Sequence, residues 1–160
     1  MTDRNTDPVT GPTTGGDRDP NAEASSSFAH EPVMRDEIVE VFATVPPGTI
    51  VDATLGGGGH AEALLAARAD IDVVGLDRDR EALDAAAARL AGYGDRLRTS
   101  HRRFDRLGDA LADHGVEQIS GALFDLGVSS PQLDRGDRGF SYRHEGPLDM
   151  RMDREQPWSA

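Results

Sequence analysis

Cysteine and lysine are both absent from the 160 residues of this sequence. Without cysteine, these residues cannot form a disulfide, a thiolate metal site or a cysteine nucleophile. All 17 basic residues are arginine, against 29 acidic residues, and the formal net charge is −12. This balance argues against a free-standing nucleic-acid binder, which needs a positive surface, but it leaves room for an enzyme that meets RNA through a local patch.

Long apolar runs are lacking as well. No run approaches the roughly 20 residues of a membrane span, and the first residues lack the charged-then-apolar pattern of a secretory signal. The length suits one ordinary domain. We therefore predict a cytoplasmic protein without membrane contacts.

Large apolar residues are scarce in the first part of the chain, which is rich in Thr, Asp, Pro, Gly and Ser. Such a segment cannot bury enough apolar surface to offset the entropy lost on ordering. We predict a disordered acidic tail over residues 1–28 and a folded domain over residues 29–160.

Helical and strand-like patterns alternate through that domain. Helical spacing covers residues 38–45, 60–68, 79–90 and 105–114, and strand-like runs cover 49–53, 72–77, 96–100 and 119–125. The alternation predicts an α/β fold, a doubly wound, Rossmann-like parallel sheet with helical crossovers. No clear periodicity follows Asp125, so we expect a partial sheet truncated after about four strands.

Glycines follow the first predicted strand and open a helix, in the pattern Gly56-x-Gly58-x-x-Ala61. Glycine lets the backbone turn tightly and approach a ligand, and the helix N-terminus attracts anionic groups. Asp77 ends the second strand, where an acid can accept both ribose hydroxyls of an adenosine moiety, while Asp79 is placed to cap the next helix. These signals predict a nucleoside-containing cofactor, either NAD or S-adenosylmethionine.

A third signal is the segment from Asp125 to Gln132, at the carboxyl end of the fourth strand, where open α/β sheets bind ligands. An acid followed by a turn of small residues suits a planar amine, because the carboxylate can accept hydrogen bonds from the N–H groups of the amine. Methylation of such an amine needs alignment and an acceptor, not a covalent intermediate. This segment favours S-adenosylmethionine over NAD.

Four stretches together make the sequence resemble one family. Three of them are Gly56–His60, Leu76–Asp79 and Asp125–Leu133, and the fourth region holds two motifs, Arg138–Tyr142 and Gly146–Asp153. The family is the bacterial ribosomal RNA small subunit methyltransferase H family, also called MraW, and the resemblance covers about residues 30–153. It implies a class I S-adenosylmethionine-dependent enzyme that methylates the exocyclic N4 of a cytidine in the decoding region of small-subunit ribosomal RNA.

The resemblance also implies a role for each site position. Gly58, Gly59 and His60 would line the methionine end of the cofactor, Asp77 would hold the ribose, Phe104 would pack near the adenine, the catalytic Asp125 would lie beside the methyl donor, and Gln132 would complete the site. Without the resemblance, Phe104 is expected in the core and Gln132 on the surface.

The family pattern continues beyond these residues, so we expect an incomplete form that is inactive alone. Two alternatives stay open: a fragment of an NAD-binding oxidoreductase, for which the glycine pattern alone would suffice, and a non-catalytic remnant. The partner implied is small-subunit ribosomal RNA or the small ribosomal subunit.

Two further groups of residues are weighed. His101 and His114 lack metal-ligand spacing with acids, so we predict no metal. Five arginines lie in the C-terminal part: Arg135, Arg138, Arg143, Arg151 and Arg154. They form either a phosphate-contacting rim or, as interleaved acids favour, a surface of alternating charge.

Overall fold

The structure is a computed structural model that describes residues 32–159. The tail predicted over residues 1–28 lies outside the described residues, and its disorder stays a prediction. No helix within residues 32–159 is long and apolar enough to cross a membrane.

Four strands form a single parallel sheet in the order β3-β2-β1-β4. They are β1 (Gly48–Asp52), β2 (Ile71–Asp77), β3 (Leu97–His101) and β4 (Gly121–Leu123). The helices that alternate with them are α2 (Arg35–Phe42), α3 (Gly59–Ala67), α4 (Arg80–Arg89) and α5 (Leu107–Asp113). The predicted α/β fold with parallel strands is confirmed.

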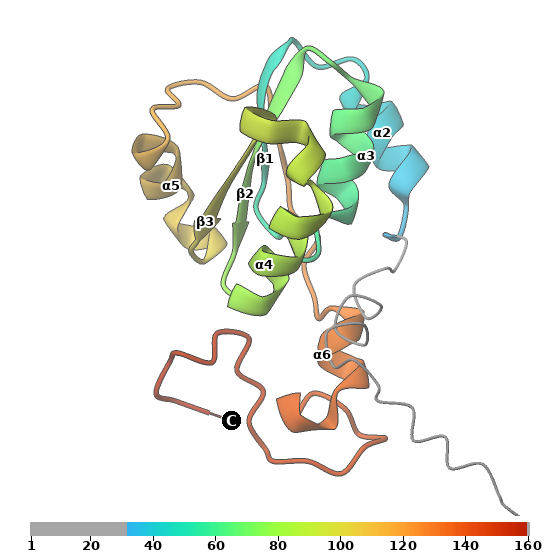
Figure 1. Cartoon of the computed structure of the whole chain (residues 1–160), viewed down its shortest axis with the longest axis vertical. Coiled ribbons are helices and arrows are strands. Elements are labelled where there is room, and N and C mark those ends of the chain that lie inside the picture. The colour runs from blue at the N-terminus through green and yellow to red at the C-terminus, as the bar shows by residue number, and fades with distance from the viewer. Residues whose placement is uncertain (1–31, 160) are drawn as a thin grey trace, which may run out of the picture.

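Helices cover both faces of the sheet, with α2, α3 and α4 on one side and α5 on the other (Figure 1). Successive strand residues point to opposite faces. In β1, Ile50 packs with Phe42 and Leu64 on the first face, while Val51 packs with Ala110 on the second. Both β1 side chains are fully buried, which explains the near-continuous apolar composition of the strand.

The structure differs from the sequence prediction after α5. The last strand was expected over residues 119–125, but β4 spans three residues because it pairs only with Ile50–Asp52 of β1. A helix that was not predicted, α6 (Ser130–Asp134), follows it. Short 3-10 turns complete the chain: η1 (Ala91–Arg96), η2 (Phe104–Arg106) and η3 (Gly136–Arg138).

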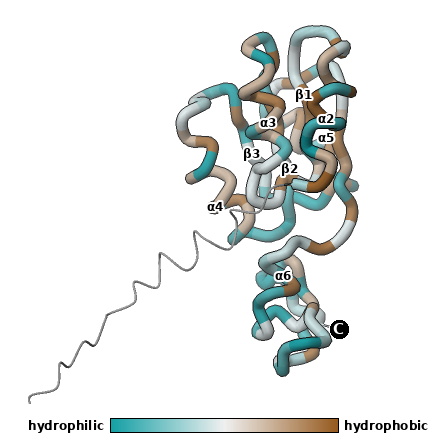
Figure 2. Tube along the Cα trace, turned by 90° about the vertical axis from the view of Figure 1, so that its right-hand side faces the viewer, coloured by the Kyte–Doolittle hydropathy of each residue, from teal (hydrophilic) through white to brown (hydrophobic). Residues whose placement is uncertain are grey.

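Residues 130–159, termed the C-terminal segment below, lie beyond the carboxyl ends of the strands (Figure 1). Figure 2 shows the segment as a distinct part beneath the α/β body. None of its residues belongs to the three hydrophobic clusters that form the described core. Contacts that join the segment to the α/β body include hydrogen bonds and ion pairs, such as those of Gln132 and Arg138 with Asp79.

Candidate functional site

The loop after β1 turns sharply through its glycines before α3 begins. Gly58 has a φ of 81°, a left-handed conformation that favours glycine, and serves as the N-cap of α3. A Cβ at this position would lie 2.8 Å from Leu90 Cδ1. The absence of a side chain thus lets the loop pack directly against the end of α4.

Asp77, at the end of β2, holds this loop from the other side. Its Oδ2 accepts a hydrogen bond from the Gly56 amide at 2.8 Å, and its Oδ1 accepts one from the Asp79 amide at 2.9 Å. Burial raises the pKa of Asp77, although both amide bonds lower it. An ionised carboxyl group has about four acceptor positions, so these amide bonds leave capacity for a ligand's hydroxyl group.

Asp79 caps α4, as the sequence predicted, by accepting a hydrogen bond from the Glu81 amide at 3.1 Å. Its other oxygen accepts hydrogen bonds from Gln132 and Arg138, which sequence reasoning did not foresee. Those partners lie 53 and 59 residues away in the chain, and no local pattern indicates them.

Asp125 follows β4 and faces the glycine loop across the carboxyl edge of the sheet. Its amide donates to Thr54 Oγ1 at 2.7 Å, and its carboxylate lies 3.6 Å from His60 Nε2. The Asp125 side chain is 63% exposed and the His60 side chain 9%, so the acid is open to a second molecule while the histidine lies behind it. The buried Nδ1 of His60 has no hydrogen-bond partner among the described residues.

A third acid, Asp52, ends β1 between these two and was missed in the sequence. It is 1% exposed; its Oδ1 accepts a hydrogen bond from the Thr54 amide, and its Oδ2 has no partner among the described residues. Burial, together with the charges of Asp77 and Asp125, raises the pKa of Asp52 to about 7. The sequence did hold a signal for this site residue, because Asp52 is an acid at the end of an apolar strand, just before the glycines.

Phe104 and Gln132 do not lie where the residues alone suggested. Phe104 is 46% exposed rather than part of the core, with its ring in an edge-to-face contact with Phe124 at 6.1 Å. Gln132 is buried rather than on the surface. It serves as N3 in the capping box of α6, where its Oε1 accepts a hydrogen bond from the Ser129 amide, and its Nε2 donates to the buried Asp79.

A cavity of about 780 Å³ lies at the carboxyl edge of the sheet, beside these groups. This volume lies within the usual range for small-molecule sites. The predicted site residues that line it are Gly59, His60, Asp77, Phe104, Asp125 and Gln132. Gly58 does not line the cavity; it shapes the loop that does. Residues not predicted also contribute, among them Arg78, Arg102, Arg103 and Met152.

The five C-terminal arginines are largely neutralised within the chain. Those that pair with acids are Arg135 with Glu81, Arg138 with Asp79, Arg151 with Asp149, and Arg154 with Asp137. Arg143 lies over the ring of Tyr142, 5.6 Å from its centroid. This pattern matches interleaved charge better than a phosphate-contacting rim, except that Arg138 is buried. Within residues 32–159 no group of three or more potential metal ligands is found.

A parallel sheet with a glycine loop after its first strand, an acid ending the second and a cavity at the carboxyl edge defines a Rossmann-like α/β domain. The particular family follows from the sequence: the family profile of the MraW methylases matches residues 27–160, and the chain belongs to this family. The chain is therefore a member of a methyltransferase family, and nothing in the comparisons supports the oxidoreductase alternative.

Named relatives agree with this assignment. The ribosomal RNA small subunit methyltransferase H of Saccharopolyspora erythraea is 52% identical over 139 residues, which cover 85% of this chain and 42% of the relative. The protein of the same name from Thermobifida fusca is 49% identical over 144 residues, covering 88% and 44% respectively. The chain thus spans less than half the length of these curated relatives.

A solved structure of an rRNA methylase from Streptococcus thermophilus is also similar to this chain. It is 26% identical with a TM-score of 0.45, and the match covers 62% of this chain and 57% of that one.

Proposed function

We propose that residues 29–160 form the N-terminal, cofactor-binding part of an S-adenosylmethionine-dependent methyltransferase that modifies the exocyclic N4 of a cytidine in small-subunit ribosomal RNA. The relatives' names support the RNA substrate, and the family supports the methyl transfer. The observation that carries the proposal is that Asp77 and Asp125 both line one cavity, with the glycine loop between them.

The residues present fit this cofactor. The remaining acceptor capacity of Asp77 suits a ribose hydroxyl, and the exposed part of the Phe104 ring offers an apolar surface to an adenine. Gly59 and His60, which begin α3, would line the methionine end. The buried Nδ1 of His60, which no described residue hydrogen-bonds, adds a polar atom toward a ligand.

Asp125 is the proposed catalytic residue. S-adenosylmethionine, when bound, supplies an electrophilic methyl group. The exposed carboxylate of Asp125 would accept an N–H hydrogen bond from the target amine, which fixes the direction of the nitrogen lone pair. A carboxylate also stabilises the positive charge that develops on that nitrogen as it is alkylated.

Calorimetry with S-adenosylhomocysteine and with NAD tests the choice of cofactor. We expect S-adenosylhomocysteine to bind and NAD to bind at least about tenfold more weakly. If NAD binds and S-adenosylhomocysteine does not, the result would support the oxidoreductase alternative. Binding of neither would leave the non-catalytic interpretation.

We further propose that these 160 residues do not methylate RNA alone. Among the described residues, β4 pairs only with β1, so its second edge is free, and Phe124 and Leu126 beside it are exposed. The net charge of −12 also opposes approach to a polyanion. Incubation of the chain with undermethylated small ribosomal subunits and labelled cofactor should leave cytidine N4 unlabelled; stoichiometric transfer would refute this.

A further inference from the structure

A buried ion pair joins the C-terminal segment to the start of α4. Arg138 is 2% exposed and Asp79 is 4% exposed, and Nη2 of the arginine lies 2.7 Å from Oδ2 of the acid. The same nitrogen donates to the carbonyl oxygens of Arg151 and Met152, at 3.3 Å and 3.2 Å. A buried charge is costly unless its partners are in place, so these contacts define one arrangement of the segment.

Asp79 transmits this arrangement to the cavity. The oxygen that accepts from Arg138 also accepts from Gln132 Nε2 at 3.2 Å, and the Asp79 amide donates to Asp77. Asp77, Gln132 and Met152 all line the cavity, whereas Arg138 does not. The buried guanidinium of Arg138 therefore contacts Met152 directly. It reaches Gln132 and Asp77 through Asp79.

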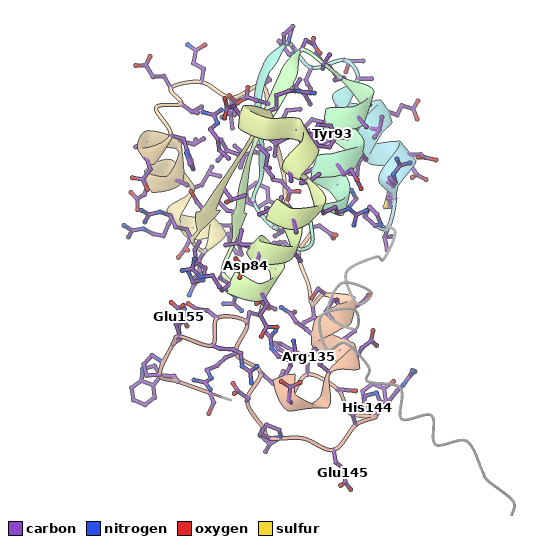
Figure 3. The ribbon with its side chains drawn as sticks, viewed as in Figure 1. Asp84, Tyr93, Arg135, His144, Glu145 and Glu155 are labelled. Carbon is purple, nitrogen blue, oxygen red and sulfur yellow. The ribbon has the colours of Figure 1, made fainter. Side chains whose placement is uncertain are left out.

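Few apolar contacts are available to replace this pair, since the C-terminal segment contributes nothing to the three core clusters. Apart from those of Arg138, its ion pairs with α4 are accessible to solvent, such as Arg135 with Glu81, whose side chains are 41% and 39% exposed. Figure 3 shows Arg135 and Glu155 on the side of the segment that faces α4, with His144 and Glu145 on the far side. Exposed pairs of this kind hold a segment weakly.

We propose that Arg138 is a positioning residue for the cofactor site: it fixes Gln132 and Met152 as one wall of the cavity by holding them against Asp79. The inference rests on the proposed function, because the ligand it names is S-adenosylmethionine. Arg138 acts through these neighbours and does not touch the ligand itself.

The test compares Arg138→Gln with Arg135→Gln, a matched control from the same short stretch whose arginine also pairs with acids but has a side chain 41% exposed, against 2% for Arg138. Calorimetry of the 160-residue chain with S-adenosylhomocysteine should show at least about tenfold weaker binding for Arg138→Gln and less than about threefold for Arg135→Gln. Arg138→Lys, which keeps the charge and loses the fork of donors, should fall between them. Equal affinities for both glutamine variants would overturn the inference.

Hydrogen exchange provides a readout that needs no ligand. In Arg138→Gln we expect faster exchange at the amides of residues 129–152, with unchanged protection in β1 and β2. Protection lost throughout the sheet would show a general folding role and would overturn the inference. Failure of the unsubstituted chain to bind the ligand would count against the proposed function, while the exchange data would still decide whether Arg138 holds the segment.

Discussion

At the scale of single residues, the carboxyl group of Asp77 accepts hydrogen bonds from the Gly56 and Asp79 amides. The same side chain lines the cavity, where we propose that it also binds the ligand. Hydrogen bonds to a charged group are worth roughly 1.5–3 kcal/mol each. Asp77→Ala should therefore weaken S-adenosylhomocysteine binding by about tenfold or more in calorimetry.

The control for Asp77 is Asp70→Ala, at the opposite end of β2, where Asp70 pairs with Arg68 on the surface. We expect Asp70→Ala to bind S-adenosylhomocysteine with the affinity of the unsubstituted chain. A loss of similar size in both variants would mean that Asp77 does not contact the ligand.

Asp52 makes the stability of the fold depend on pH. Its pKa is raised from 3.8 to about 7, so the folded chain binds more protons than the unfolded chain between these values. Stability contributed by this group is present at low pH and is lost as pH rises from about 4 to about 7. Asp52→Asn carries no charge at this position. Between pH 4 and pH 8, its free energy of unfolding should therefore rise relative to that of the unsubstituted chain, by up to about 4 kcal/mol.

Urea unfolding of both chains at the two pH values measures this difference. Asp72→Asn is the comparison, since Asp72 ion-pairs with Arg98 at the other end of the sheet. A constant difference between Asp52→Asn and the unsubstituted chain across this range would show that Asp52 ionises normally.

At the scale of elements, the turn between β1 and α3 depends on the conformation of Gly58. A left-handed conformation costs an ordinary residue roughly 1–2 kcal/mol, and a Cβ would also lie within 3.2 Å of Ala86 Cβ. Gly58→Ala should thus lower the free energy of unfolding by at least about 2 kcal/mol.

Gly92→Ala is the matched substitution, because a Cβ at Gly92 meets nothing within 4 Å. Chemical denaturation should find this variant within about 0.5 kcal/mol of the original chain. Equal losses for the two glycines would contradict the packing described for the loop.

Elements built from apolar periodicity were predictable from the sequence. The strand β2 and the helix α4, with its cap at Asp79, fall close to their expected bounds because burial decides them. The helix α6 was not predicted, although Ser129 and Gln132 form a recognisable capping box, because no apolar period follows it. The burial of Arg138 depends on a partner distant in sequence, which no local pattern reveals.

At the scale of the whole molecule, the edge of β4 that pairs with no other described strand and the loop after it expose apolar side chains near the site. Leu126 is 67% exposed and Val128 46%. Edges and patches of this type promote association between copies. Sedimentation velocity at rising concentration should detect self-association of the chain, and Leu126→Ser should reduce it.

Leu148→Ser controls for the loss of an exposed leucine, since Leu148 is 82% exposed but lies in the C-terminal segment. It should leave the association unchanged. Equal effects of both serine variants would place the contact elsewhere.

The strand order β3-β2-β1-β4 has a consequence for how the chain reaches this structure. The pairs β1–β2 and β2–β3 join neighbours in the sequence, whereas β4 must return to β1 across the whole intervening chain. Contacts between distant parts of a chain form slowly, because a large loop must close first. We expect a folding pathway in which Asp77, the proposed ribose ligand, is in place early and Asp125 arrives last, so that ligand binding reports on the final step of folding.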